Sequence, residues 1–244
     1  MTRRLTFTLL LLSLLGLGGC ASVKGPTDPQ DPLEGYNRAM YKFNDAVDRA
    51  VLKPVAKGYV KVTPAPVRTG VNNFFSNLDD VVVLVNDLLQ FKVKQAASDL
   101  GRLTFNSTVG LFGLIDVATP MNFPKHNEDF GQTLGYWGVG PGPYLVLPFL
   151  GPSDIRDTGG LVADWQIDPI QQIDDTNTRY GTVALKVIDK RANLLRASSV
   201  LESATFDPYA FMRDAYLQHR RNEVYDGNPP QPSFEEMMRE SGPP

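Results

Sequence analysis

Few side chains in this 244-residue sequence could do enzyme chemistry. One cysteine, Cys20, and two histidines, His126 and His219, exclude a disulfide framework and multi-cysteine metal sites, and they leave little for zinc or a histidine base. We expect His126, in the run His-Asn-Glu-Asp, to be solvated or locally hydrogen-bonded rather than a metal ligand. Four carboxylates could serve acid-base catalysis, but Arg156 lies between the first two, so helix capping and ion pairing are the expectation: Asp154, Asp157, Asp164 and Asp168.

Motifs for nucleotides and nucleophiles are incomplete. Ser153, in Gly-Pro-Ser-Asp-Ile, lacks the second glycine of a nucleophile elbow. Gly138, Gly140 and Gly142 alternate, but Pro143 breaks the dinucleotide-binding spacing, and the sequence contains no Gly-Lys pair for a Walker A loop. With 24 Lys and Arg against 27 Asp and Glu, the net charge of −3 argues against nucleic acid as a partner. We therefore predict a protein that is not an enzyme, with no catalytic or metal-binding residues.

The single cysteine follows a leader-like segment. Arg3 and Arg4 precede an apolar run at residues 5–17, whose length of about 20 Å is short for a hydrocarbon core of about 30 Å. The next residues, LGGCA, resemble the lipobox of bacterial lipoproteins, in which the cysteine thiol takes a diacylglyceryl group. We predict a signal peptide at residues 1–19 and a lipid anchor on Cys20. The alternative is that Cys20 follows an ordinary cleavage site by chance and carries no lipid. Ala21 in place of Asp favours the outer membrane, by analogy with enterobacterial sorting.

Composition and periodicity divide the mature chain. Residues 20–32 should form the lipidated cysteine and a tether, residues 33–225 one domain, and residues 226–244, with five prolines, a disordered tail. Apolar spacing predicts amphipathic helices at about 33–51, 71–89, 93–117 and 184–195, with Lys53-Pro54 ending the first. Asp207-Pro208 should cap a further helix. No segment has a run of alternating strands, so the fold class is mostly α.

Residues 130–153 carry no formal charge and contain six glycines and four prolines. No continuous helix survives four prolines, and a lipid-exposed span would leave backbone donors unsatisfied, so a hairpin or ordered loop packed on helices fits better. Tyr136, Trp137, Tyr144 and Phe149 give the segment the aromatic character of membrane interfaces. An irregular core segment is the alternative.

Six blocks of the sequence share a pattern. They are DPLEGYNRAMYKFN at 31–44, FNSTVG and GLIDVA within 105–118, EDFGQTLG at 128–135, GVGPGPYLVLP at 138–148, Arg156-Asp157 with Gly159-Gly160, and DPY with RDAY within 203–216. Together they resemble the MlaA family, also called VacJ lipoproteins. The resemblance covers residues 31–220 in order and matches least at 164–182.

The resemblance implies a ring-like single domain of amphipathic helices with a Gly/Pro-rich hairpin, embedded in the periplasmic leaflet of a Gram-negative outer membrane. Members remove mislocalised phospholipid from the outer leaflet through a channel and pass it to a periplasmic carrier, MlaC, beside a trimeric porin. No cofactor is implied beyond the covalent lipid on Cys20 and the phospholipid cargo. Without a nucleotide motif the protein would be a passive conduit. The alternatives are an envelope scaffold that moves no lipid, and an enzyme using Asp154, Asp157 or His126.

We hypothesise that residues 130–148 form a hairpin that lines or gates the channel and touches a porin. Helix 33–51 would pack against this gate through Phe43 and Asn44. The remaining channel or gate candidates are Phe130, Gly131, Leu134, Tyr136, Trp137, Gly138, Gly140, Gly142 and Tyr144.

Overall fold

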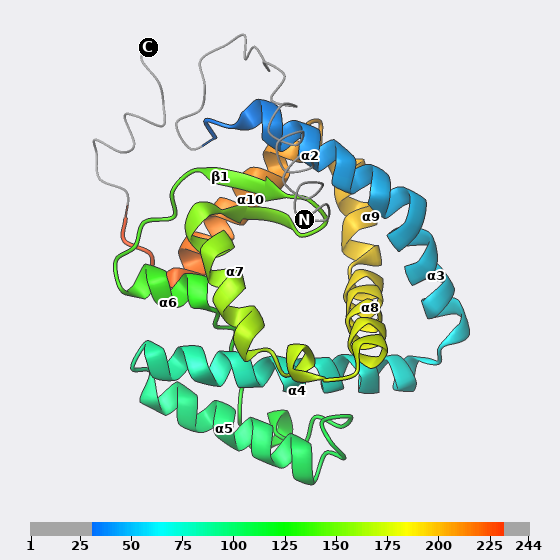
Figure 1. The fold of residues 1–244 in the computed structure, drawn as a ribbon, viewed down its shortest axis with the longest axis vertical. Coiled ribbons are helices and arrows are strands. Elements are labelled where there is room, and N and C mark those ends of the chain that lie inside the picture. The colour runs from blue at the N-terminus through cyan, green and yellow to red at the C-terminus, as the bar shows by residue number, and fades with distance from the viewer. Residues whose placement is uncertain (1–30, 232–244) are drawn as a thin grey trace, which may run out of the picture.

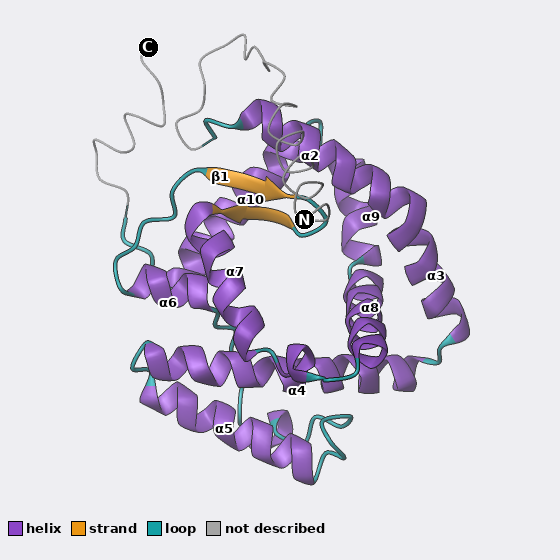
Figure 2. Ribbon diagram, viewed as in Figure 1, coloured by secondary structure: helices purple, strands orange, loops and turns teal. Residues whose placement is uncertain are grey.

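Helices follow one another around a ring in the computed structural model, which describes residues 31–231 (Figure 1). Helices dominate this range and one short pair of strands interrupts them (Figure 2), which confirms the mostly α single domain. The predicted signal peptide, the anchor Cys20 and most of the predicted tail lie outside the described residues.

One side of the ring is a continuous helical rod. It consists of α2 (Glu34–Val47), the π-helical turn η1 (Asp48–Leu52) and α3 (Lys53–Val62). The prediction that Lys53-Pro54 ends the first helix is wrong. The N–H of Lys53 donates to the carbonyl of Asp48, five residues back, and this wider turn carries the helix past Pro54, which has no N–H to donate.

The next part of the ring is an antiparallel pair, α4 (Ala65–Leu89) and α5 (Val93–Thr108), followed by the 3-10 turn η2 (Thr119–Met121). The helix predicted to run to residue 117 ends earlier, because Leu111, Phe112 and Gly113 have φ angles of 53°, 59° and 87°. A Cβ on Gly113 would lie 2.7 Å from the Cβ of Asn77, so only glycine fits there.

The opposite side begins with α6 (Phe130–Tyr136), and the strands β1 (Tyr144–Leu147) and β2 (Gly151–Asp154) pair antiparallel, with Tyr144 opposite Asp154. The hairpin therefore occupies residues 144–154 rather than 130–148. Residues 130–136 are helical because the carboxylate of Asp129 caps them, accepting from the N–H of Gln132.

Four further elements close the ring: α7 (Ile155–Ile167), the 3-10 turn η3 (Pro169–Gln172), α8 (Thr176–Asn193) and α9 (Leu195–Ala204). The last helix, α10 (Pro208–Val224), starts as predicted, with Asp207 as its cap and Pro208 in its first turn. α8 packs against both α3 and α4, and α10 packs against α6.

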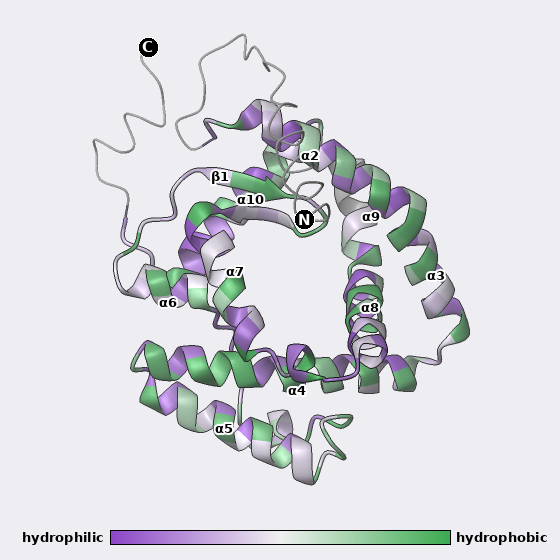
Figure 3. Ribbon diagram, in the orientation of Figure 1, coloured by the Kyte–Doolittle hydropathy of each residue, from purple (hydrophilic) through white to green (hydrophobic). Residues whose placement is uncertain are grey.

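The pattern of burial in the described residues is the reverse of that in a soluble domain, because polar side chains are buried more often than hydrophobic ones. The buried side chains include nineteen polar or charged ones and nine hydrophobic ones, whereas Phe91 and Phe112 are 76% and 80% exposed. Hydrophobic residues recur along α3, α4 and α5 (Figure 3). Even so, none of the helices between residues 31 and 231 combines the length and hydropathy needed to cross a bilayer.

Candidate functional site

The hairpin is fastened to α2 by two asparagines. The side chain of Asn44 donates to the carbonyl of Leu147 (2.9 Å) and accepts from the N–H of Phe149 (2.8 Å), so it holds the turn. Asn37, two helical turns earlier, does the same for β1: it donates to the carbonyl of Tyr144 (3.0 Å) and accepts from the N–H of Val146 (2.8 Å). Each amide thus satisfies a donor and an acceptor of the strand.

Phe43 also contacts the hairpin, with its ring edge-to-face on Phe149 at 5.1 Å between centroids. Phe43 and Asn44 thus contact the hairpin at 144–154, and their role at a gate stays a prediction. The sequence reasoning missed Asn37. A signal was available, because Asn37 and Asn44 are seven residues apart and lie on one face of the helix.

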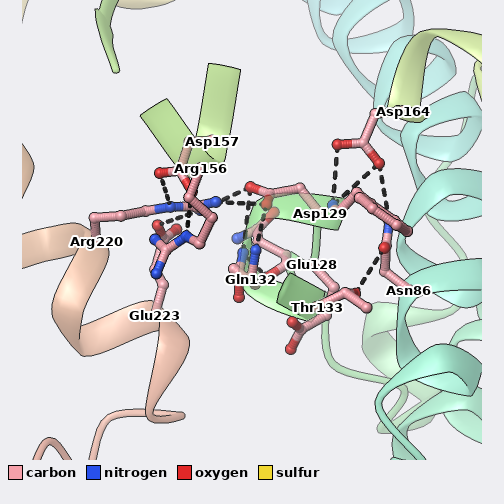
Figure 4. Close-up of polar contacts among 12 residues, drawn as sticks. Asn86, Glu128, Asp129, Gln132, Thr133, Arg156, Asp157, Asp164, Arg220 and Glu223 are labelled. Carbon is pink, nitrogen blue, oxygen red and sulfur yellow. Dashed lines mark hydrogen bonds and ion pairs between the residues drawn. The ribbon is translucent and has the colours of Figure 1, made fainter. Parts of the chain in front are cut away.

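Ahead of the hairpin, α6 is fixed by the buried guanidinium of Arg220 from α10 (Figure 4). Arg220 bonds both oxygens of Asp129, at 2.7 and 2.5 Å, and one oxygen of Asp157 at 2.5 Å. Burial alone would raise the pKa of Asp157, but its bonds to Arg220, Arg156 and Tyr216 hold the pKa below its usual value. This network joins α6, α7 and α10.

A second set of contacts fixes α6 to α4 and α7. The carboxylate of Asp164 accepts from the N–H of Phe130 (3.0 Å) and from the amide of Asn86 (3.0 Å), and the hydroxyl of Thr133 donates to Asn86 (2.8 Å), as Figure 4 shows. Burial raises the pKa of Asp164. The short helix before the hairpin is thus held on three sides by polar groups.

The candidate residues on α6 itself serve packing. A Cβ on Gly131 would lie 2.3 Å from an oxygen of Asp157, so the network requires glycine there. Phe130 packs edge-to-face on Trp137 at 6.4 Å, and the indole N–H of Trp137 donates to the carbonyl of Leu89 (3.2 Å). Leu134 is half-buried. These contacts anchor the segment, and the place of these residues at a channel or gate stays a prediction.

The glycines of the connecting loop have a different setting. No atom lies within 4 Å of where a Cβ of Gly138 or Gly140 would be, and the φ angle of Gly138 is +88°. Gly142, with φ of +71°, approaches the Ile155 side chain to 3.2 Å. Tyr136 is exposed, like all of residues 137–143, whereas Tyr144 is buried in the core with Tyr209. The channel and gate candidates of this segment therefore divide into an anchored helix, an exposed loop and a docked strand.

The carboxylates weighed for catalysis act structurally. Asp154 caps α7 by accepting from the N–H of Asp157 (2.7 Å), and burial raises its pKa to about 6. Asp168 caps the turn that follows α7. The Nδ1 atom of His126 lies 2.9 Å from Asp99, which makes it locally bonded as expected. Residues 31–231 contain no group of three or more potential metal ligands.

A pocket of about 570 Å³ opens between the α2–η1 rod, the hairpin and the start of α10. Its wall is apolar at Val146 and Met212 and charged along the rod. Asp48 makes a bidentate ion pair with Arg191 (2.6 and 2.8 Å), and Asp45 pairs with Arg49 at 3.0 Å. The lining residues are Tyr41, Asn44, Asp45, Asp48, Arg49, Lys53, Tyr144, Val146, Gly151, Pro152, Ser198, Pro208 and Met212. The pocket is thus amphipathic and borders the hairpin.

The outer face of α5 and the loop after it carry almost no charge. Lys94 is the one charged side chain among the exposed residues of α5, and Thr104 and Thr108 direct their hydroxyls to carbonyls of their own helix (2.7 and 2.6 Å). In the loop, the N–H groups of residues 109, 110 and 112–115 all donate to carbonyls within 105–111. Polar groups satisfied in this way suit contact with hydrocarbon.

These features define a class of protein: a helical ring that buries many polar and charged side chains, leaves large apolar side chains exposed and keeps an amphipathic pocket beside a docked hairpin. The model of the family described as MlaA lipoprotein matches residues 29–223. The chain belongs to this family.

Similar proteins agree with the family assignment. The intermembrane phospholipid transport system lipoproteins MlaA of Shigella flexneri and Escherichia coli K12 are each 40% identical over 222 residues, covering 86% of both chains. The lipoprotein of the same name from Haemophilus influenzae is 35% identical over 232 residues, covering 89% of both. A solved structure concerning maintenance of bacterial outer membrane lipid asymmetry has a TM-score of 0.70 at 35% identity, covering 81% of this chain and 99% of that one.

Proposed function

We propose that this protein is an outer-membrane lipoprotein that removes mislocalised phospholipids from the outer leaflet and hands them to a periplasmic carrier. The observation that carries the proposal is the amphipathic pocket of about 570 Å³ beside the hairpin, in a ring that leaves many large apolar side chains exposed. Relatives named for intermembrane phospholipid transport support it.

The reversed burial supports residence in one leaflet. The loop at 109–115 exposes Val109, Leu111, Phe112, Leu114 and Ile115, between 45% and 80% each. Burying such side chains in hydrocarbon stabilises each by about 1.5–3 kcal/mol. The ring would lie in the periplasmic leaflet without crossing the membrane, anchored by lipid on Cys20.

The pocket lowers the barrier to a phospholipid head group. Moving an uncompensated charge through hydrocarbon costs several kcal/mol or more, whereas the charged rod supplies partners for the head group and the apolar wall supplies contact for acyl chains. Such a conduit sets a path and needs no nucleotide. Direction would come from the asymmetry of the leaflets and from a downstream carrier of the MlaC kind.

The loop at 137–143 is the part of the ring best suited to gating. It is exposed, and its glycines at 138 and 140 meet no neighbouring atom, while Asn37 and Asn44 hold the strand that follows. Its exposed aromatics, Tyr136 and Trp137, fit a membrane interface or the side of a trimeric porin.

The first test measures phospholipid on the cell surface in cells with the protein, without it, and with Cys20→Ala. A rise in both altered strains supports an anchored lipid-removal conduit. Unchanged surface phospholipid in both would refute it and leave an envelope scaffold as the function.

A second test addresses the gate. Gly138→Val places a β-branched residue at a φ of +88° in the loop, and Gly227→Val makes the same change at a φ of +81° beyond α10, where no atom lies within 4 Å either. We expect altered surface phospholipid and porin co-purification for the first variant alone. Equal behaviour of the two variants would contradict gating by this loop.

A further inference from the structure

The charged wall of the pocket has both signs in one short stretch of the α2–η1 rod and the start of α3. Asp45 and Asp48 lie toward its N-terminal end, and Arg49 and Lys53 toward its C-terminal end. Asp45 and Arg49 are four residues apart, so they share a face and are about one helical turn of 5.4 Å apart, whereas Asp48 directly precedes Arg49. Asp48 is already paired with Arg191, so Asp45 and Arg49 are the opposite charges of the rod that a head group can meet.

We infer that this pocket selects zwitterionic head groups, which carry a phosphate and an ammonium, over head groups with negative charge alone. The inference rests on the proposed function and names its cargo more narrowly. The phosphate lies toward Arg49, and the ammonium toward Asp45.

The two ion pairs in the pocket have different roles. Asp48 and Arg191 are mostly buried, at 24% and 12% side-chain exposure, and Arg191 also donates to Ser198 (3.2 Å), so this pair is a fixed part of the wall. Asp45 and Arg49 are 33% and 64% exposed, and an exposed pair of this kind contributes little stability. The second pair can therefore exchange its partners for those of a ligand.

Exchange favours a zwitterion because every charge keeps an opposite partner. When phosphate replaces Asp45 at the Arg49 guanidinium, the ammonium of the same head group compensates the released carboxylate. A phosphatidylglycerol head group brings only the negative charge and leaves the carboxylate beside phosphate, a like-charge contact that costs free energy.

The experiment uses the full lipidated protein in vesicles of equal phosphatidylethanolamine and phosphatidylglycerol, re-isolated in mild detergent, with the bound lipid measured by mass spectrometry. We expect the wild type to enrich phosphatidylethanolamine. Arg49→Gln should reduce the enrichment by about two- to fivefold, the range for a partly exposed ion contact. Asp45→Lys should shift the bound lipid toward phosphatidylglycerol. Lys42→Gln removes an exposed charge from α2 outside the pocket and should leave the ratio unchanged.

A charge-exchanged variant, Asp45→Arg with Arg49→Asp, separates charge balance from a structural effect. It keeps both signs and the intrahelical pair, so enrichment should persist. Loss of enrichment in this variant, or a wild type that binds the two lipids in the vesicle ratio, overturns the inference while leaving lipid transport standing. A protein that carries no phospholipid at all overturns the proposed function and the inference together.

Discussion

α6 and α7 touch backbone to backbone at Gly131 and Gly160, and this contact predicts a sharp difference between two neighbouring substitutions. A Cβ on Gly160 would lie 2.5 Å from the backbone nitrogen of Gly131 and 2.9 Å from its Cα. A Cβ on Gly159, one residue earlier in α7, would meet no atom within 4 Å. Gly160→Ala should therefore strain the fold, and Gly159→Ala should not.

The loss of stability expected for Gly160→Ala follows from the displacement of α6 that the new methyl group requires. Carbon atoms pack at about 3.5–4.0 Å, so α6 has to shift by about 1 Å to accept the new methyl group. Overpacking of this kind costs about 1–3 kcal/mol. If the shift also separates Arg220 from Asp129, breaking a buried ion pair adds about 3–5 kcal/mol. Replacing glycine by alanine inside a helix stabilises both variants by about 1 kcal/mol through helix propensity. The difference in stability between the two variants therefore reports the contact between α6 and α7.

The assay is thermal unfolding of the protein in detergent, followed by circular dichroism at helical wavelengths. For a chain of this length, 1 kcal/mol of stability corresponds to about 2–4 °C in Tm. The overpacking cost alone should therefore place the Tm of Gly160→Ala about 2–12 °C below that of Gly159→Ala, and loss of the ion pair would widen the gap. Equal Tm values for the two variants would refute the close approach of α6 and α7, and with it the account of how the hairpin is positioned.

Three other changes test separate parts of the structure. Asn44→Ala removes two hydrogen bonds to the hairpin turn, at about 1 kcal/mol each, and should speed amide exchange there; unchanged exchange would contradict the docking. Burial, together with the neighbouring Asp99, raises the pKa of Asp87 from 3.8 to about 8. The folded chain therefore retains a proton that the unfolded chain releases, and the unfolding free energy should fall as pH rises through this window, by up to about 1.4 kcal/mol per pH unit. Asp87→Asn should remove that slope in denaturant titrations, the exposed Asp174→Asn should keep it, and equal slopes would refute the assignment. Phe112→Asn retains a residue that tolerates a φ of 59° but should weaken vesicle binding of the unlipidated protein by about 1.5–3 kcal/mol; undiminished flotation would exclude insertion of this loop.

Local rules predicted part of the fold and tertiary contacts decided the rest. The cap at Asp207-Pro208 and the apolar periodicity of α2 and α4 depend on neighbours in sequence, so these helices could be predicted. Two boundaries could not. The π turn before Pro54 depends on an adjustment of the backbone. The helix at 130–136 depends on buried partners from α7 and α10.

The same reasoning explains the result for the site. Phe43 and Asn44 were found because their block of sequence resembles the family, and the hairpin does contact both. Gly131 was expected at a gate, yet its lack of a side chain makes room for Asp157 and Arg220, which lie 26 and 89 residues further along. A glycine required by such distant groups looks the same in sequence as one required by a turn.

The reversed burial links the stability of the ring to its proposed place in the membrane. In a soluble domain, apolar burial drives folding, whereas here carboxylates such as Asp80 and Asp99 are fully buried and many large apolar side chains are exposed. Buried charges are tolerated only when they are paired, and Asp80 is paired with Lys125 and Arg102, as Asp157 is with Arg220. These polar contacts fix the geometry of the ring. In the membrane setting proposed above, hydrocarbon around the ring would supply the apolar contacts that its interior lacks, so charges could line a pocket without a large hydrophobic core.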